Sequence, residues 1–167
     1  MKSIRGARIY TMDGEITEDP TLFFDGKDFF RKMTTNKKEK EICTLLMKHP
    51  HNNIITIYDI GNNYIDMEFV HTDIHIEDRS KLHYVMMEVK TYLQEIGIIY
   101  IDWKVDNIGI SNDGTYKLFD FDCSGVMDIE TKQWIITPPT CWSYHDAIQH
   151  GMDTPVDIDN YAFKEGI

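Results

Sequence analysis

At 167 residues, with 42% hydrophobic and 12% aromatic side chains, the chain has enough apolar residues for a packed core, which argues against global disorder. Its formal net charge of −11 argues against binding to nucleic acid or to anionic membranes, because phosphate contacts need clustered Lys and Arg. No apolar run approaches the length of a membrane-spanning helix and the first residues lack a signal peptide, so we expect a soluble, intracellular protein.

Short strands and turns are predicted for the N-terminal residues. The apolar runs Arg8–Met12, Leu22–Phe24 and Phe29–Met33 favour strands, and the Asp-Gly pairs between them favour tight turns, because glycine accepts positive φ. A helix is expected next, since Asn36 and Glu39 have the spacing of a capping box and His49-Pro50 ends the apolar stripe. Strands over Ile54–Ile60 and Tyr64–Val70 follow.

Apolar residues recur at helical spacing from Asp78 to Ile96, which predicts a long amphipathic helix ending at Gly97. Short strands are predicted at Ile98–Ile101, Ile108–Ile110 and Tyr116–Phe121. Beyond Asp122 the prolines indicate irregular structure, until a final helix begins over Asp157–Phe163.

The cysteines are three in number, Cys43, Cys123 and Cys141, and none has CxxC spacing. This pattern argues against a disulfide framework and against a Cys-rich zinc site, and it favours a reducing compartment.

Two motifs follow the long helix. In YIDWKVDN, Asp102 and Asn107 are five residues apart, and in KLFDFD, Asp120 lies thirteen residues after Asn107. Solvated turns would explain single aspartates, but the pair of motifs is more specific. YIDWKVDN is similar to the HRDxxxxN catalytic loop of protein kinases, and KLFDFD is similar to the segment that carries their DFG motif. The chain therefore resembles a minimal protein-kinase-like domain, of the small sort encoded by large DNA viruses.

The resemblance implies a site for phosphoryl transfer, a reaction that depends on positioning and charge stabilisation. Asn107 and Asp120 would hold Mg²⁺ (or Mn²⁺) against the phosphates of ATP, because this cation prefers hard oxygen ligands. Asp102 would accept or orient the proton of the substrate hydroxyl, and Lys104 would steady the transferring phosphoryl group.

The resemblance also implies nucleotide-binding residues in the N-terminal half. Lys32 would be the ATP-binding lysine and would form an ion pair with Glu41, although Glu39 competes for that position. The backbone of Glu68 and Val70 would meet the edge of the adenine.

The chain departs from the kinase pattern at several positions. It has no GxGxxG loop, and Phe30 stands where kinases usually keep a small residue over the adenine. Tyr100 and Ile101 replace the His and Arg of the HRD motif. Asp122 replaces the DFG glycine, a change also found in small-molecule kinases of the aminoglycoside-phosphotransferase type.

The last residues resemble the start of the kinase αF helix. Asp159 would anchor the backbone of the catalytic loop, with Asp157 as the alternative. Because the chain ends soon afterwards, we expect an uncovered apolar face, and a second copy or a partner protein that covers it. The residues expected on this face are Trp142, Tyr144, Ile158, Tyr161 and Phe163.

These features together predict an α+β, two-lobed protein-kinase-like fold with a truncated C-terminal lobe. Residues 1–70 would form a β-rich nucleotide-binding lobe, and residues 71–167 a mainly helical lobe with the catalytic loop and metal site. The expected function is ATP- and Mg²⁺-dependent transfer to a protein Ser or Thr hydroxyl, an acceptor class that Lys104 favours. Two alternatives stay open: a non-catalytic mimic that binds and restrains a host kinase or scaffold, and a small-molecule kinase.

Overall fold

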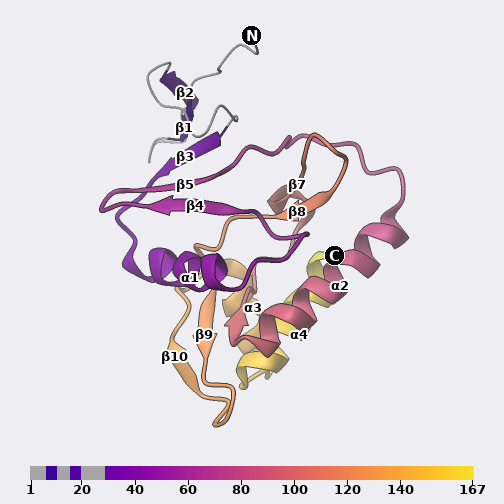
Figure 1. Ribbon diagram of the computed structural model, residues 1–167. Coiled ribbons are helices and arrows are strands. Elements are labelled where there is room, and N and C mark those ends of the chain that lie inside the picture. Colours follow the sequence, from indigo (N-terminus) through magenta and orange to yellow (C-terminus); the bar gives the residue numbers. More distant parts are fainter. Residues whose placement is uncertain (1–6, 11–15, 20–28) are drawn as a thin grey trace.

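Strands and helices alternate along the chain in the computed structural model, which describes residues 7–10, 16–19 and 29–167 (Figure 1). These residues form four α-helices and three small sheets, so the class is α+β, as predicted. In this part of the chain no helix is both long enough and apolar enough to cross a membrane. The predicted strand over Leu22–Phe24 and the two Asp-Gly turns lie outside the described residues.

The largest sheet has five strands in the order β2-β1-β3-β5-β4. Its strands are β1 (Ala7–Tyr10), β2 (Ile16–Asp19), β3 (Phe29–Met33), β4 (Ile57–Ile60) and β5 (Tyr64–Glu68). All neighbours are antiparallel except β1 and β3, which run parallel. In β3, successive side chains point to opposite faces, so Phe30 and Lys32 share one face and Arg31 lies on the other. There Arg31 donates two hydrogen bonds to Asp66 of β5, at 2.7 and 2.8 Å.

Helix α1 (Lys37–Lys48) packs along β4, below the sheet in Figure 1. Asn36 caps it as predicted, because its side-chain oxygen accepts a hydrogen bond from the Glu39 N–H at 3.3 Å. The second half of the expected capping box is wrong. The Glu39 carboxylate turns to Lys32 instead, and the Asn36 N–H donates to the hydroxyl of Thr34 at 3.1 Å.

Helix α2 (Arg79–Glu95) confirms the long amphipathic helix of the sequence analysis. Asp78 caps its N-terminus by accepting from the Lys81 N–H at 3.0 Å, and Gly97 follows its end with φ +86°, a conformation that suits glycine. Its buried stripe consists of Leu82, Met86, Val89 and Leu93. This face packs on β6 and β8 and so supports the segment that carries both motifs.

The second half of the chain contains two more sheets. The strands β6 (Ile98–Ile99), β9 (Gly125–Met127) and β10 (Trp134–Ile136) form one, and β7 (Ile108–Ile110) pairs with β8 (Tyr116–Leu118) in the other. The expectation of irregular structure beyond Asp122 is therefore wrong for β9, β10 and helix α3 (Trp142–Gln149). These strands depend on distant partners, since Ile98 pairs with Val126 and Ile99 with Gly125.

Helix α4 (Pro155–Gly166) begins at Thr154, whose hydroxyl accepts from the Asp157 N–H at 3.2 Å. The predicted uncovered face is wrong for two of its residues, because Ile158 is 1% exposed and Phe163 is 3% exposed. Phe163 packs against Trp103 and His83, with ring centroids 5.0 and 5.2 Å apart. Trp142 is 76% exposed, as expected, and the partner that would cover it stays a prediction.

Candidate active site

Two adjoining cavities, of about 280 and 350 Å³, lie between the five-stranded sheet and the segments that carry the two motifs. They share Phe30, Ile55, Met67, Thr72 and Phe119 as lining residues. The smaller cavity continues along the chain from Glu68 to Asp73. Beyond these shared residues, the larger one is lined by five charged or amide side chains, Lys32, Glu39, Asp106, Asn107 and Asp120. The combined cleft thus has an apolar end and a charged end.

Lys32 lies between two carboxylates at the charged end. Its Nζ atom is 2.6 Å from Glu39 Oε1 and 3.4 Å from Asp120 Oδ1. Burial lowers the pKa of the Lys32 ammonium, but Asp120 and Glu39 outweigh that effect and raise the pKa above its ordinary value. The Lys32 ammonium therefore links β3, α1 and the segment after β8.

The predicted ion pair between Lys32 and Glu41 is wrong. Glu39 is buried at 3% exposure, whereas Glu41 is exposed. Residues two positions apart in an α-helix, such as Glu39 and Glu41, are separated by about 200° around the axis, so only one of these side chains can face the cavity. Glu39 is on the face with Ile42, Cys43 and Leu46, which are buried in the core.

Asp102 and Asn107 are brought together by a short 3₁₀ turn, η1 (Val105–Asn107). The Asn107 side-chain nitrogen donates to the Asp102 backbone oxygen and to Asp102 Oδ2, both at 2.9 Å. Lys104 Nζ lies 3.4 Å from the same Oδ2 atom, and the Lys104 side chain is 52% exposed. Asp102 thus lies beside the cavity and is held by a residue that lines it.

The loop before Asp102 has a strained backbone. Ile101 has φ +70°, which is rare for a β-branched residue, and the Asp102 N–H bonds back to the Tyr100 oxygen at 2.9 Å. Such a conformation costs on the order of 1–3 kcal/mol and persists only where its surroundings hold it.

Asp159 of α4 holds this loop. Its Oδ1 atom accepts hydrogen bonds from the Ile101 N–H at 2.9 Å and from the Trp103 indole at 2.7 Å, and its Oδ2 accepts from Gln94 at 2.9 Å. Burial raises the pKa of Asp159 and these hydrogen bonds oppose the rise. Asp157, the alternative anchor, is exposed. Of the two, Asp159 is therefore the residue in contact with the loop.

Tyr100 occupies a position whose importance the sequence did not reveal. It is fully buried, and its hydroxyl donates a hydrogen bond to the Phe119 backbone oxygen at 2.6 Å. Its ring packs against those of Phe121 and Trp103, with ring centroids 5.0 and 4.7 Å apart. It ties the loop before Asp102 to the segment that carries Asp120. A buried Tyr needs a partner for its hydroxyl, but nothing in the sequence names that partner.

Asp120 and Asp122 share a hydrogen bond and differ in pKa. Burial opposes ionisation of Asp120, but Lys32 and Asp122 hold the pKa of Asp120 below its ordinary value. Burial, together with Asp120, raises the pKa of Asp122 to about 6. Asp120 also has φ +63°, a conformation uncommon outside glycine. The pair thus combines an ionised carboxylate at the cavity with a carboxyl group that titrates at a higher pH.

The apolar end is lined by residues of β5 and the segment after it. Glu68 and Val70 both line the smaller cavity, and the contact of their backbone with an adenine stays a prediction. The Glu68 N–H donates to the Thr56 oxygen at 2.9 Å, and its carboxylate lies 3.2 Å from Lys117 Nζ. The N–H of Glu68 is therefore already paired within the sheet region.

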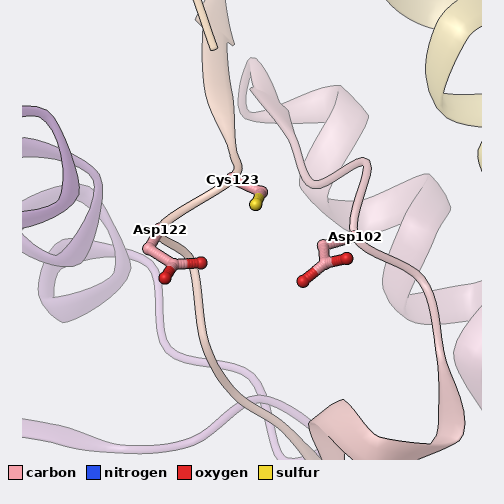
Figure 2. A group of neighbouring side chains, drawn as sticks. All are labelled: Asp102, Asp122 and Cys123. Carbon is pink, nitrogen blue, oxygen red and sulfur yellow. The ribbon is translucent and has the colours of Figure 1, made fainter. Parts of the chain in front are cut away.

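A second group of side chains lies beside Asp102. Figure 2 shows the carboxylates of Asp102 and Asp122 facing a common space, with the thiol of Cys123 next to them. Each residue offers one atom that could bind a metal ion, a carboxylate oxygen or the sulfur, and these three atoms all lie within 4.8 Å of one another. The motifs do not predict this group, because Asp102 and Asp122 belong to different motifs and Cys123 lies in neither.

Comparison with known proteins gives a distant similarity to a protein kinase. The chain is 27% identical over 112 residues to mitogen-activated protein kinase 13 of Bos taurus, covering 56% of this chain and 31% of the bovine protein. The Mus musculus protein of the same name is 28% identical over 112 residues, with the same coverage. No family model matches the chain. The chain spans about a third of the length of these relatives, and the similarity supports a kinase-like protein at a coarse level.

Proposed function

We propose that this chain is a two-lobed, kinase-like phosphotransferase that uses ATP and Mg²⁺ (or Mn²⁺) and phosphorylates a Ser or Thr hydroxyl of a protein. The observation that carries the proposal is the convergence of Lys32, Glu39, Asn107 and Asp120 on one cavity of about 350 Å³. These side chains come from β3, α1, η1 and the segment after β8. The distant similarity to mitogen-activated protein kinase 13 adds support.

The donor atoms at the charged end suit Mg²⁺. The Asn107 nitrogen is committed to Asp102, which leaves the amide oxygen as a ligand, and Asp120 offers a carboxylate of lowered pKa. Both are hard oxygen donors. A cation held here would neutralise the charge of the phosphates, and Lys32 would contact the same phosphates from the side of the sheet.

Asp102 orients the acceptor hydroxyl and takes up its proton. The Asn107 amide and the Lys104 ammonium fix the position of the carboxylate, which is half-buried at the edge of the cavity. Lys104 can swing toward the transferring phosphoryl group because its side chain is half exposed. The adenine would occupy the apolar end, between Phe30 and Met67.

The test is calorimetric titration with ATP, with and without Mg²⁺, followed by a γ-phosphoryl transfer assay. We expect binding that requires the cation, because Asp120 and Asp122 would otherwise repel the triphosphate. Lys32→Met should abolish binding. Lys81→Met, which removes the same charge from an exposed position outside both cavities, should leave it unchanged.

The acceptor is tested in the same assay with protein substrates and with aminoglycosides. Transfer to Ser or Thr supports the proposal, and transfer to aminoglycosides alone would replace it with a small-molecule kinase. Phe30 lines both cavities and stands where kinases usually keep a small residue over the adenine. Its bulk favours a second candidate, a non-catalytic protein that binds a kinase or scaffold. Absence of ATP binding in either condition would favour that candidate.

A further inference from the structure

The segment after β8, which carries Asp120, is held at both ends by one residue, Tyr100. At the start of the segment, the Tyr100 hydroxyl donates a hydrogen bond to the Phe119 backbone oxygen at 2.6 Å. At its end, the Ser124 hydroxyl donates to the Tyr100 backbone oxygen at 3.0 Å. Tyr100 comes two residues before Asp102, so these two hydrogen bonds connect both segments of the candidate active site.

The Tyr100 backbone oxygen accepts a second hydrogen bond. It comes from the Asp102 N–H at 2.9 Å and closes the turn in which Ile101 has φ +70°. A carbonyl oxygen has two lone pairs, so the Asp102 N–H and the Ser124 hydroxyl can bind it at once. The two donors together fix the orientation of the peptide group between Tyr100 and Ile101. That orientation determines the direction in which the chain enters Asp102.

Ser124 is placed for this contact by the strands on either side of it. It is 1% exposed, and a buried hydroxyl needs a hydrogen-bond partner. β6 and β9 pair at Ile99 and Gly125. These two residues are the direct neighbours of Tyr100 and Ser124 along the chain. The side-chain hydrogen bond therefore extends the strand pairing by one step, at the point where the chain leaves β6 for the loop with Asp102.

We infer that Ser124 is a positioning residue of the candidate active site, which orients Asp102 through the Tyr100 backbone oxygen. Ser124 lines neither of the two cavities, so it acts on the site only through this oxygen. The inference rests on the proposed function where it concerns the transfer rate. Where it concerns the shape of the loop, it rests on the hydrogen bonds alone.

Ser124→Ala removes the hydroxyl and leaves the Tyr100 backbone oxygen with one donor fewer. We expect the transfer rate at saturating ATP to fall by about 10- to 100-fold, because a small misplacement of a catalytic group has an effect of this size. The dissociation constant of ATP with Mg²⁺ should stay unchanged, since Lys32 keeps its contact with Asp120 at 3.4 Å. Single-turnover kinetics and calorimetry measure the two quantities.

Two further variants complete the set. Ser124→Cys keeps a weak donor in nearly the same volume and should transfer at an intermediate rate. Ser80→Ala makes the same change as Ser124→Ala at an exposed position in the first turn of α2 and should alter neither quantity. An unchanged rate in Ser124→Ala, or an equal loss of rate and of ATP affinity, would overturn the inference.

Amide hydrogen exchange, followed by NMR, tests the loop without any activity. The Asp102 N–H should exchange faster in Ser124→Ala than in the natural chain, because its acceptor is held less firmly. The Met127 N–H, which donates to the Gly97 oxygen at 2.7 Å, should exchange at the same rate in both. Unchanged exchange at Asp102 would overturn the inference, whether or not the chain transfers phosphoryl groups. Faster exchange at Asp102, in a chain that transfers none, would support the inference about the loop and count against the proposed function alone.

Discussion

Glu39 Oε1 lies 2.6 Å from Lys32 Nζ, while Glu41, on the same helix, is exposed to solvent. If Lys32 binds ATP phosphates, Glu39 positions it. Glu39→Gln should therefore weaken ATP binding by roughly 1–2 kcal/mol, about tenfold in dissociation constant. Glu41→Gln makes the same change on the other face of α1 and should have no effect in calorimetry. Equal effects of the two variants would contradict the assignment of Glu39.

Asp102→Asn should separate binding from chemistry. Asn can still accept the hydrogen bond from Asn107, so the loop should keep its shape, but it cannot take the proton of the acceptor hydroxyl. We expect the transfer rate to fall by about 10²–10⁴-fold, with the ATP dissociation constant nearly unchanged. Single-turnover kinetics and calorimetry measure the two quantities. Loss of ATP binding in this variant would place Asp102 in the nucleotide site instead.

Asp122 should make the protein less stable as the pH rises through a defined window. Its pKa is about 6 in the folded chain against an ordinary value of 3.8, so between these values the folded state holds a proton that the unfolded state has lost. The contribution of Asp122 to the free energy of unfolding therefore falls as the pH rises across this window.

Asp122→Asn removes this titration and should become more stable relative to the natural sequence as the pH rises from 3.8 to about 6. Urea denaturation across this range measures the difference. The Asp120 carboxyl, whose pKa Lys32 lowers, keeps Lys32 as its neighbour in both proteins. Asp153→Asn, at an exposed position, is the matched control. A stability difference that does not vary with pH would refute the prediction.

Asp159→Ala should destabilise the chain severely. It removes the acceptor of the Ile101 N–H and the Trp103 indole, and leaves both donors buried without a partner. Each such group costs about 1–3 kcal/mol, so we expect a loss of roughly 3 kcal/mol or more in chemical denaturation. Asp157→Ala, two residues earlier on the exposed side of α4, should change stability by about 0.5 kcal/mol or less. Similar losses would show that Asp159 is not the anchor.

N-cap residues, apolar periodicity and motif spacing correctly predicted the elements that depend on residues close together in the sequence. Asn36 is the N-cap of α1, and the apolar stripe expected for α2 is buried at Leu82, Met86, Val89 and Leu93. The two motifs also predicted that Asp102 and Asn107 would lie near each other. In each case the spacing along the chain already determines which side chains share a face or a turn.

Tertiary contacts determine what the sequence could not show. The capping-box spacing does not say whether the Glu39 side chain turns back to the helix start or across to Lys32. β9 has too short an apolar run to predict, and it forms because Ile98 and Ile99 offer a partner. Ile158 and Phe163 were expected on the surface because the position of α4 against Trp103 cannot be read from α4 itself.

The turn at Ile101 has a consequence for the order in which the chain opens. Its strained conformation depends on a carboxylate 58 residues later in the sequence, so the loop cannot hold its shape once α4 has detached. The amide protons of Ile101 and of α4 should then exchange with solvent at a common rate, as one cooperative unit. The loop that carries Asp102 and the C-terminal helix would thus be lost and regained together.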